Sequence, residues 1–292
     1  MSSRDSALLS AYLARKDAVA VKALLLNERR VPPRHRAEVW ALMLGLDKTA
    51  DDLTAVNEAL ETIDVANAPN HRVIAQDVER TRPSQVSTEH QLWLRKALTL
   101  FCHECDADYM QGLNEILAPF ILLTDPPQPS ALAYCLFRRL CERYLPTMFA
   151  SKEIGPLQFE LRVFHELVLY FDPELCIFLD NSQMTPQVYA TPWLVTLFSR
   201  HTPVQALFAL WDSFIVFADD NVMLPLFTVL AFVRYHRDVL LQCHEEHVPE
   251  MLSSQLVLET EEDGARAFGW EGSFASWSSG ARTSRFRERE ER

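Results

Sequence analysis

Residues 109–123 read YMQGLNEILAPFILL, and from Gln111 onward their apolar positions recur with the period of an α-helix. Gly112 in this stretch is one of only three glycines in the first 263 residues, whereas all 16 prolines lie between Pro32 and Pro249. Many prolines with few glycines are typical of helices that stop at proline, and not of tight hairpin turns. The pattern therefore predicts an all-α fold.

Helical spacing of apolar residues continues on both sides of this stretch. Upstream, it predicts two short helices within residues 4–29, a helix over 34–46 that Gly45 ends, and a helix over 88–101 in which Thr88 and Gln91 form a capping box. Downstream, it predicts helices at about 130–149, 157–171, 187–200, 203–217 and 222–243. Strand-like alternation is weak throughout the chain.

The composition changes at about Ser254, where acidic residues, serines and four of the seven glycines gather before an Arg/Glu-rich end. Such a segment cannot bury enough apolar surface to fold, so residues 254–292 are predicted to be a disordered tail. The whole chain is 48% apolar, and the part before the tail is long enough for one large core. We expect one two-lobed helical domain over residues 31–250, with the helices of residues 1–30 packing on it.

The net charge of −12, from 40 acidic and 28 basic residues, argues against binding to nucleic acid or unaided binding to anionic lipid. The six cysteines form no dense framework, which is typical of a reducing compartment. The longest apolar run, residues 222–233, is too short for a transmembrane segment. These features predict a cytoplasmic protein whose partner is another protein.

Several kinds of active site are excluded or disfavoured by the same sequence. Three scattered glycines cannot build a phosphate-binding loop, and no Gly-x-Ser-x-Gly elbow is present. Zinc ligands stand at Cys102 and Cys105 and again at Cys243, His244 and His247, but both stretches fall at predicted helix ends, where such spacing arises easily. We favour buried thiols and surface histidines there, and expect no cofactor or metal site of the chain's own.

Three short motifs remain, in the order RAEVW at residues 36–40, IAQDVERT at residues 74–81 and YMQG at residues 109–112. Each is weak alone, because an exposed Arg80 paired with Asp77 or a polar Gln111 at a helix start is ordinary. Together, in this order and spacing, they are specific.

The three motifs resemble the RxxxW, IxxDxxR and YxQG signatures of the TBC domain of Rab GTPase-activating proteins, an all-helical domain of two lobes. The resemblance covers roughly residues 31–250, where Trp193 and the LWD step at residues 210–212 look like later helices of that family. Residues 111–120 are similar to a branch in which some members have lost the catalytic residues, but this chain keeps both.

The resemblance implies that Arg80 is an arginine finger and Gln111 a glutamine finger, both supplied in trans to a GTP-loaded Rab-family GTPase. Hydrolysis of GTP spreads charge over phosphate oxygens, which a planar guanidinium can bridge, while a carboxamide can hold the attacking water. GTP and magnesium would then belong to the partner, so the chain needs no small-molecule active site. It would switch off vesicle-traffic GTPases and reach endomembranes only through its partners.

The other motif residues are expected to support these two. Tyr109 and Gly112 would fix the turn that carries Gln111, and Asp77 would orient Arg80 through an ion pair. For the first motif we favour an architectural role, because positions four apart share one helix face: Trp40 is core and Arg36 is an internal brace. Arg36 is also a candidate second partner of Asp77.

One residue departs from the family pattern, because Asp108 stands where a glycine usually precedes the tyrosine of the third motif. A carboxylate there could bond to the start of the following helix or could oppose an incoming phosphate. Two alternatives to an active Rab GAP therefore stay open. The chain could be a weak or inactive Rab-binding scaffold on the same fold, or a helical adaptor without any link to GTPases.

Overall fold

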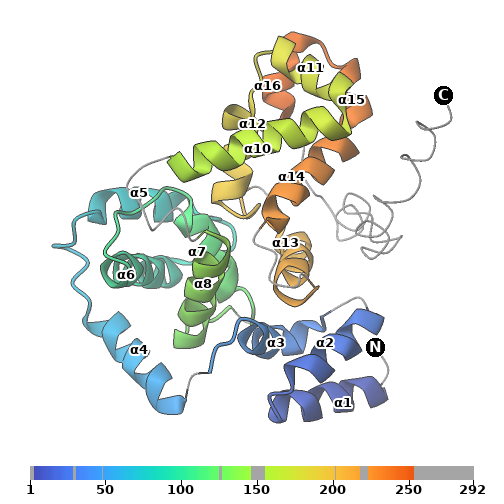
Figure 1. Cartoon of the computed structure of the whole chain (residues 1–292). Coiled ribbons are helices and arrows are strands. Elements are labelled where there is room, and N and C mark those ends of the chain that lie inside the picture. The colour runs from blue at the N-terminus through green and yellow to red at the C-terminus, as the bar shows by residue number, and fades with distance from the viewer. Residues whose placement is uncertain are drawn as a thin grey trace.

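The computed structural model describes residues 3–28, 31–47, 49–124, 127–145, 155–200, 202–217 and 223–252. These residues form helices joined by turns, with no strand among them, so the prediction of an all-α fold is confirmed. Figure 1 shows two lobes, the lower one built from α1–α8 with α13 and the upper one from α10–α12 with α14–α16. The predicted tail over residues 254–292 lies outside the described residues.

The N-terminal helices α1 (Ser3–Ala14) and α2 (Ala18–Glu28) pack against each other and against α3 (Arg36–Met43), which follows a short 3₁₀ turn, Pro33–His35. Leu9, Val21 and Leu25 from these helices are completely buried and belong to the main core. Helix α3 ends just before Gly45, whose positive φ of 65° lets the chain turn away.

The rest of the lower lobe comprises α4 (Ala50–Thr62), α5 (His71–Arg80), α6 (Thr88–Glu104), α7 (Leu113–Ile121) and α8 (Ala131–Tyr144). Helix α7 is apolar on nearly all sides because α5, α6 and α8 all pack against it. It is thus the central helix of this lobe, and its first turn meets the end of α5.

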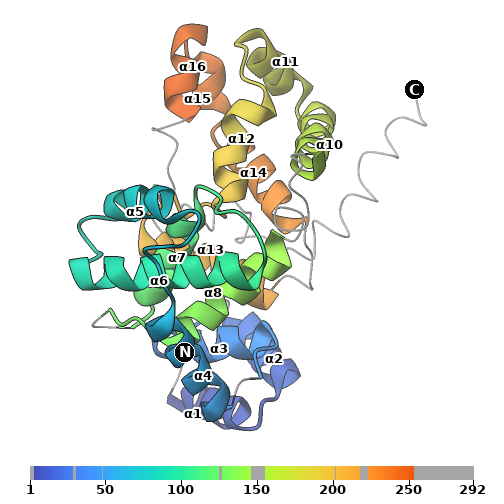
Figure 2. The ribbon, with the colours of Figure 1, turned by 90° about the vertical axis from the view of Figure 1, so that its left-hand side faces the viewer.

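The upper lobe comprises α10 (Gly155–Phe171), α11 (Pro173–Asn181), α12 (Pro186–Val195), α14 (Leu224–Tyr235), α15 (Arg237–Gln242), the 3₁₀ turn Glu245–His247 and α16 (Val248–Glu250). Helix α13 (Val204–Asp212) and the π-helical turn Ser213–Phe217 return the chain to the lower lobe, as both ribbon views show (Figures 1 and 2).

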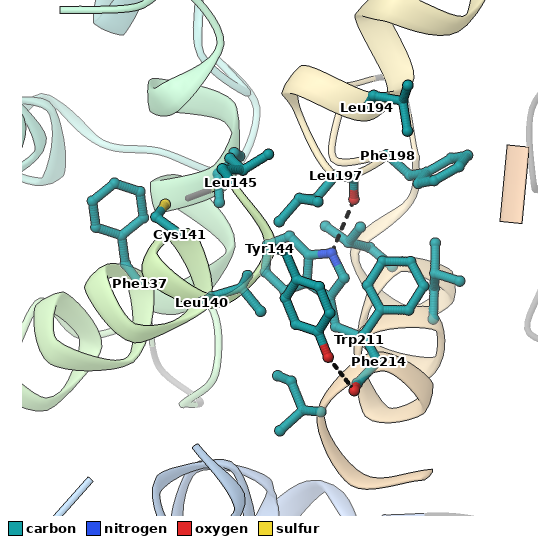
Figure 3. Close-up of a cluster of buried hydrophobic side chains, with 14 of the residues drawn as sticks. Phe137, Leu140, Cys141, Tyr144, Leu145, Leu194, Leu197, Phe198, Trp211 and Phe214 are labelled. Carbon is teal, nitrogen blue, oxygen red and sulfur yellow. Dashed lines mark hydrogen bonds between the residues drawn. The ribbon is translucent and has the colours of Figure 1, made fainter. Parts of the chain in front are cut away.

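The two lobes share one hydrophobic core, and α13 supplies its central residue, Trp211 (Figure 3). The Trp211 indole donates a hydrogen bond of 2.9 Å to the carbonyl of Leu197, after α12, and its ring stacks on Phe120 of α7 with centroids 5.3 Å apart. Nearby, the Tyr144 hydroxyl at the end of α8 donates to the Phe214 carbonyl. Aromatic packing and these polar ties fix the lobes on each other.

Prolines start helices in this fold more than they stop them. Pro173, Pro186 and Pro225 lie in the first turns of α11, α12 and α14, where a backbone N–H has no helical partner to lose. The expected helix over 222–243 is interrupted at His236, and α4, α5, α11 and α16 were not predicted.

The start of α6 also differs from the prediction. The N-cap is Ser87 and not Thr88, and its hydroxyl accepts a hydrogen bond from the N–H of His90, whose ring faces the Ser87 N–H. A serine one residue earlier satisfies the same helix-end donors, which is why the sequence pattern missed the boundary by one position.

Candidate functional site

Arg80 is the last residue of α5, and its side chain is turned outward. Ile74, Asp77 and Val78 form the buried face of this helix, whereas the Arg80 side chain is 74% exposed. Its Nη2 donates to Asp77 Oδ1 at 3.0 Å and its Nε donates to the Gln76 carbonyl at 3.2 Å. The guanidinium is therefore held along one edge while most of its surface faces solvent.

Asp77 connects Arg80 to the third motif. While its Oδ1 accepts from Arg80, its Oδ2 lies 3.0 Å from the Tyr109 hydroxyl, which donates toward it. Burial, and then the nearby Asp77 charge, raise the pKa of Tyr109 well above its usual range, so the hydroxyl keeps its proton and remains a donor. The carboxylate is thereby fixed from both sides.

Gly112 is the N-cap of α7 and adopts the left-handed conformation, with φ of 109° and ψ of −20°. A Cβ on this residue would lie 3.0 Å from Thr196 Cγ2, at the end of α12 in the other lobe. Glycine is thus required here both for the backbone angle and for the close approach of the two lobes. The exposed side chain of Gln111 immediately precedes this turn.

Asn114 links these segments, although its role was not anticipated from the sequence. Its Oδ1 accepts from the Gly112 N–H at 3.2 Å and faces the Tyr109 hydroxyl at 3.0 Å, while its Nδ2 donates to Thr81 Oγ1 at 2.9 Å. Asn114 is buried in the first turn of an otherwise apolar helix. A polar residue in an otherwise apolar helix is the sequence feature from which this role could have been predicted, because a buried carboxamide needs hydrogen-bond partners.

Arg82, just beyond α5, ties the same segment to the upper lobe. It has a positive φ of 41°, and its Nη2 donates to the carbonyls of Ser199 and Thr202 between α12 and α13. Burial lowers its pKa and the Glu115 charge opposes that shift, while burial raises the pKa of Glu115. A positive φ at a non-glycine residue and a half-buried cation both cost stability, so the hydrogen bonds of Arg82 to the upper lobe form against a local cost.

The first motif lies elsewhere, and the expected pairing of Arg36 with Asp77 is wrong. Arg36 and Asp212 are 4% and 5% exposed, and Arg36 Nη2 donates to Asp212 Oδ2 at 3.0 Å. The Trp40 indole donates to Asp212 Oδ1 at 2.7 Å. Helix α3 packs beside α13, so the motif's common face meets Asp212 and not α5. Arg36 and Trp40 brace the core at this position.

Asp108 is exposed, and its charge contributes, after burial and Cys105, to raising the pKa of the Cys102 thiol to about 12. The carboxylate therefore lies near α6, and its effect on an incoming phosphate stays a prediction. The cysteines and histidines at 102–105 and 243–247 form no cluster of metal ligands within the described part of the chain. There, the one such group is His165, Cys176 and Asp180.

Comparison with known proteins gives this arrangement a context. A family model described as the Rab-GTPase-TBC domain matches residues 33–241. A mouse protein named TBC domain-containing protein kinase-like protein is 29% identical over 239 residues, which cover 80% of this chain but 25% of that protein. The yeast mitotic check point protein BUB2 is 32% identical over 145 residues, covering 50% of this chain and 45% of BUB2. The chain therefore covers well under two thirds of the length of each of these relatives.

Solved structures share the fold. The Ypt/Rab-GAP domain of Gyp1p superposes with a TM-score of 0.73 at 17% identity, covering 87% of this chain and 91% of that domain. A flagellar RabGAP TBC domain from Chlamydomonas gives a TM-score of 0.66 at 19% identity, covering 91% of this chain and 90% of that one.

Among the described residues, no helix has the length and apolar character needed to span a membrane.

Proposed function

The chain belongs to the Rab-GTPase-TBC domain family, and we propose that it accelerates GTP hydrolysis by a GTP-loaded Rab-type GTPase, with Arg80 and Gln111 inserted in trans. The geometry around Arg80 is the main support for this role. An exposed arginine is held at one edge by a carboxylate whose other oxygen is bound by Tyr109, two residues before Gln111.

The chemistry of GTP hydrolysis matches these two side chains. As the terminal phosphate is transferred to water, negative charge spreads over its oxygens, and a permanently charged planar fork stabilises several of them at once. Gln111 has a donor and an acceptor with which to orient the water. The partner supplies the nucleotide and its magnesium, and this chain's residues supply charge and orientation.

The hydrogen-bond network supports such a role because it restrains the Arg80 side chain and the backbone turn that carries Gln111 before a partner arrives. Arg80 makes two bonds along one edge, which restrict its rotamers, and the Gln111 turn is held through Gly112 and Asn114. Ordering an arginine side chain and a backbone turn in advance lowers the entropy lost on binding. An arginine that is both exposed and restrained is suited to insertion into a neighbouring site.

The proposed partner also accounts for where the protein would act. A Rab-type GTPase carries its regulator to the membranes of vesicle traffic, so the chain would be cytoplasmic and would meet endomembranes through that partner. This part of the proposal rests on family membership.

The test is single-turnover GTP hydrolysis with a panel of Rab GTPases, comparing the wild type with Arg80→Ala. Arg72→Ala is the matched control, because Arg72 is another exposed arginine on α5. We expect at least one Rab to be accelerated by the wild type and by the control but not by Arg80→Ala. Equal rates for all three proteins on every accelerated Rab would refute the assignment of Arg80.

A second candidate is a Rab-binding scaffold with little or no GAP activity. Asp108 favours it, since a carboxylate one residue before the third motif repels phosphate. The same panel separates the two, because a scaffold binds GTP-loaded Rab without faster hydrolysis. If so, Asp108→Gly should raise the rate.

A further inference from the structure

We propose that His165, Cys176 and Asp180 form a binding site for one Zn²⁺ ion that joins α10 to α11 in the upper lobe. None of these residues takes part in the Arg80 network, so the proposal stands apart from any action on a GTPase.

The helical framework brings the three ligands together. Cys176 and Asp180 are four residues apart on α11, so they lie on one face of that helix. That face packs on α10, which contributes His165. The two helices run side by side in the upper lobe (Figure 1).

The separations between ligand atoms suit a single tetrahedral ion. His165 Nε2 lies 3.0 Å from the nearer Asp180 oxygen and 3.6 Å from Cys176 Sγ, and Cys176 Sγ lies 4.0 Å from Asp180 Oδ2. Zinc bonds of about 2.0–2.3 Å at tetrahedral angles place ligand atoms roughly 3.3–3.6 Å apart. Shifts of about half an ångström would therefore seat all three atoms around one ion.

The ligand types select zinc among the common divalent ions. A thiolate, an imidazole nitrogen and a carboxylate together are typical of zinc, whereas magnesium and calcium take oxygen ligands. Asp180 and Glu166 place negative charge near Cys176 and, after burial, contribute to raising the pKa of its thiol to about 11. A dication would offset this charge, and its binding releases the thiol proton to solvent.

Access to the site is asymmetric. Cys176 is only 2% exposed and forms its floor, whereas the side chains of His165 and Asp180 are 33% and 44% exposed. An ion could enter between these two without opening the core. Three protein ligands leave a fourth tetrahedral position for water.

The first experiment titrates the full chain, kept reduced with a non-chelating phosphine, with Zn²⁺ against a chromophoric chelator. We expect one ion per wild-type chain and at least a tenfold lower affinity for His165→Gln and for Asp180→Asn. Both residues are partly exposed, so both variants should keep the wild-type helix content. Cys102→Ser is the control and should bind zinc as the wild type does.

The second experiment substitutes Co²⁺, because thiolate ligation gives a charge-transfer absorption that identifies sulfur as a ligand. The band should appear in the wild type and in Cys102→Ser and should be lost in Cys176→Ser. If Cys176→Ser does not fold, loss of the band in Asp180→Asn and His165→Gln decides the question. Absence of zinc binding by the wild type, or its loss only in Cys102→Ser, overturns the proposal.

Discussion

Two arginines of this molecule each bind an aspartate with the same 3.0 Å contact, yet their surroundings are opposite. Arg36 and Asp212 are 4% and 5% exposed, whereas Arg80 is 74% exposed beside an Asp77 that is 10% exposed. Arg36 therefore has no face left for a partner protein. Arg80 is restrained by Asp77 but keeps most of its surface for a new contact. The same kind of Arg–Asp ion pair stabilises the core at Arg36 and orients an exposed cation at Arg80.

This difference can be tested by replacing the planar guanidinium of Arg80 with an ammonium group, which keeps the charge. Arg80→Lys should reduce GTPase acceleration by about a thousandfold or more, because an ammonium ion cannot bridge two phosphate oxygens. Its melting temperature should equal that of the wild type, since the Arg80 side chain is mostly in water. The measurements are single-turnover hydrolysis and thermal unfolding, and a stability loss without an activity loss would reverse the roles assigned to the two arginines.

Arg36→Met should produce the opposite result, a large loss of stability. The substitution removes the guanidinium that neutralises the buried Asp212 carboxylate, although the Trp40 indole still donates to that carboxylate. We expect this loss to lower the free energy of unfolding by about 3–5 kcal/mol. Denaturant unfolding measures this loss. The double variant Arg36→Met/Asp212→Leu should recover part of it, because the uncompensated charge is gone. No recovery would mean that Arg36 stabilises the core by packing alone.

Gly112→Ala tests the turn that follows Gln111, and we expect it to cost about 1–3 kcal/mol of stability, because φ is 109°. The added Cβ would also press on Thr196 Cγ2 at 3.0 Å. The double variant Gly112→Ala/Thr196→Ser should recover the steric part but not the backbone part. Full recovery would show that strain in the turn contributes nothing.

Tyr109→Phe should have the smallest effect, about 0.5–1.5 kcal/mol, because it removes one hydroxyl from the Asp77 network. Here we expect GTPase acceleration to fall by a few fold, since Asp77 would hold Arg80 less firmly. Tyr12→Phe in α1 is the control, because it removes a tyrosine hydroxyl that is distant from Arg80 in the sequence. Wild-type rates for Tyr109→Phe would show that Asp77 needs no second support.

Local patterns were enough to predict most of the helices. Apolar spacing located α1, α2, α3, α6 and α8, which each have one face in the core, and α7, which is buried on nearly all sides. It missed α4, whose start depends on a capping box between Thr49 and Asp52, α5, a short helix with few apolar residues, and α11, a short helix that begins at proline. A single interruption at His236 was also invisible to periodicity, because apolar residues continue on both sides.

The site was harder to predict because its contacts join distant segments. The partner of Arg36 lies 176 residues away, so a spacing argument found the shared face with Trp40 but assigned the wrong carboxylate. Motif order predicted Asp77, Arg80 and Tyr109, which the fold does bring together, whereas no motif pointed to Asn114. The assignment of Arg80 and Gln111 to catalysis stays a prediction.

The tie made by Arg82 has a mechanical consequence. Arg82 follows Arg80 by two residues and is fastened to the carbonyls of Ser199 and Thr202 in the other half of the molecule. Any rotation of one lobe against the other would pull on the end of α5 and re-aim Arg80. The orientation of Arg80 is therefore coupled to the relative position of the two lobes, and a protein that binds both lobes would also set the direction of that arginine.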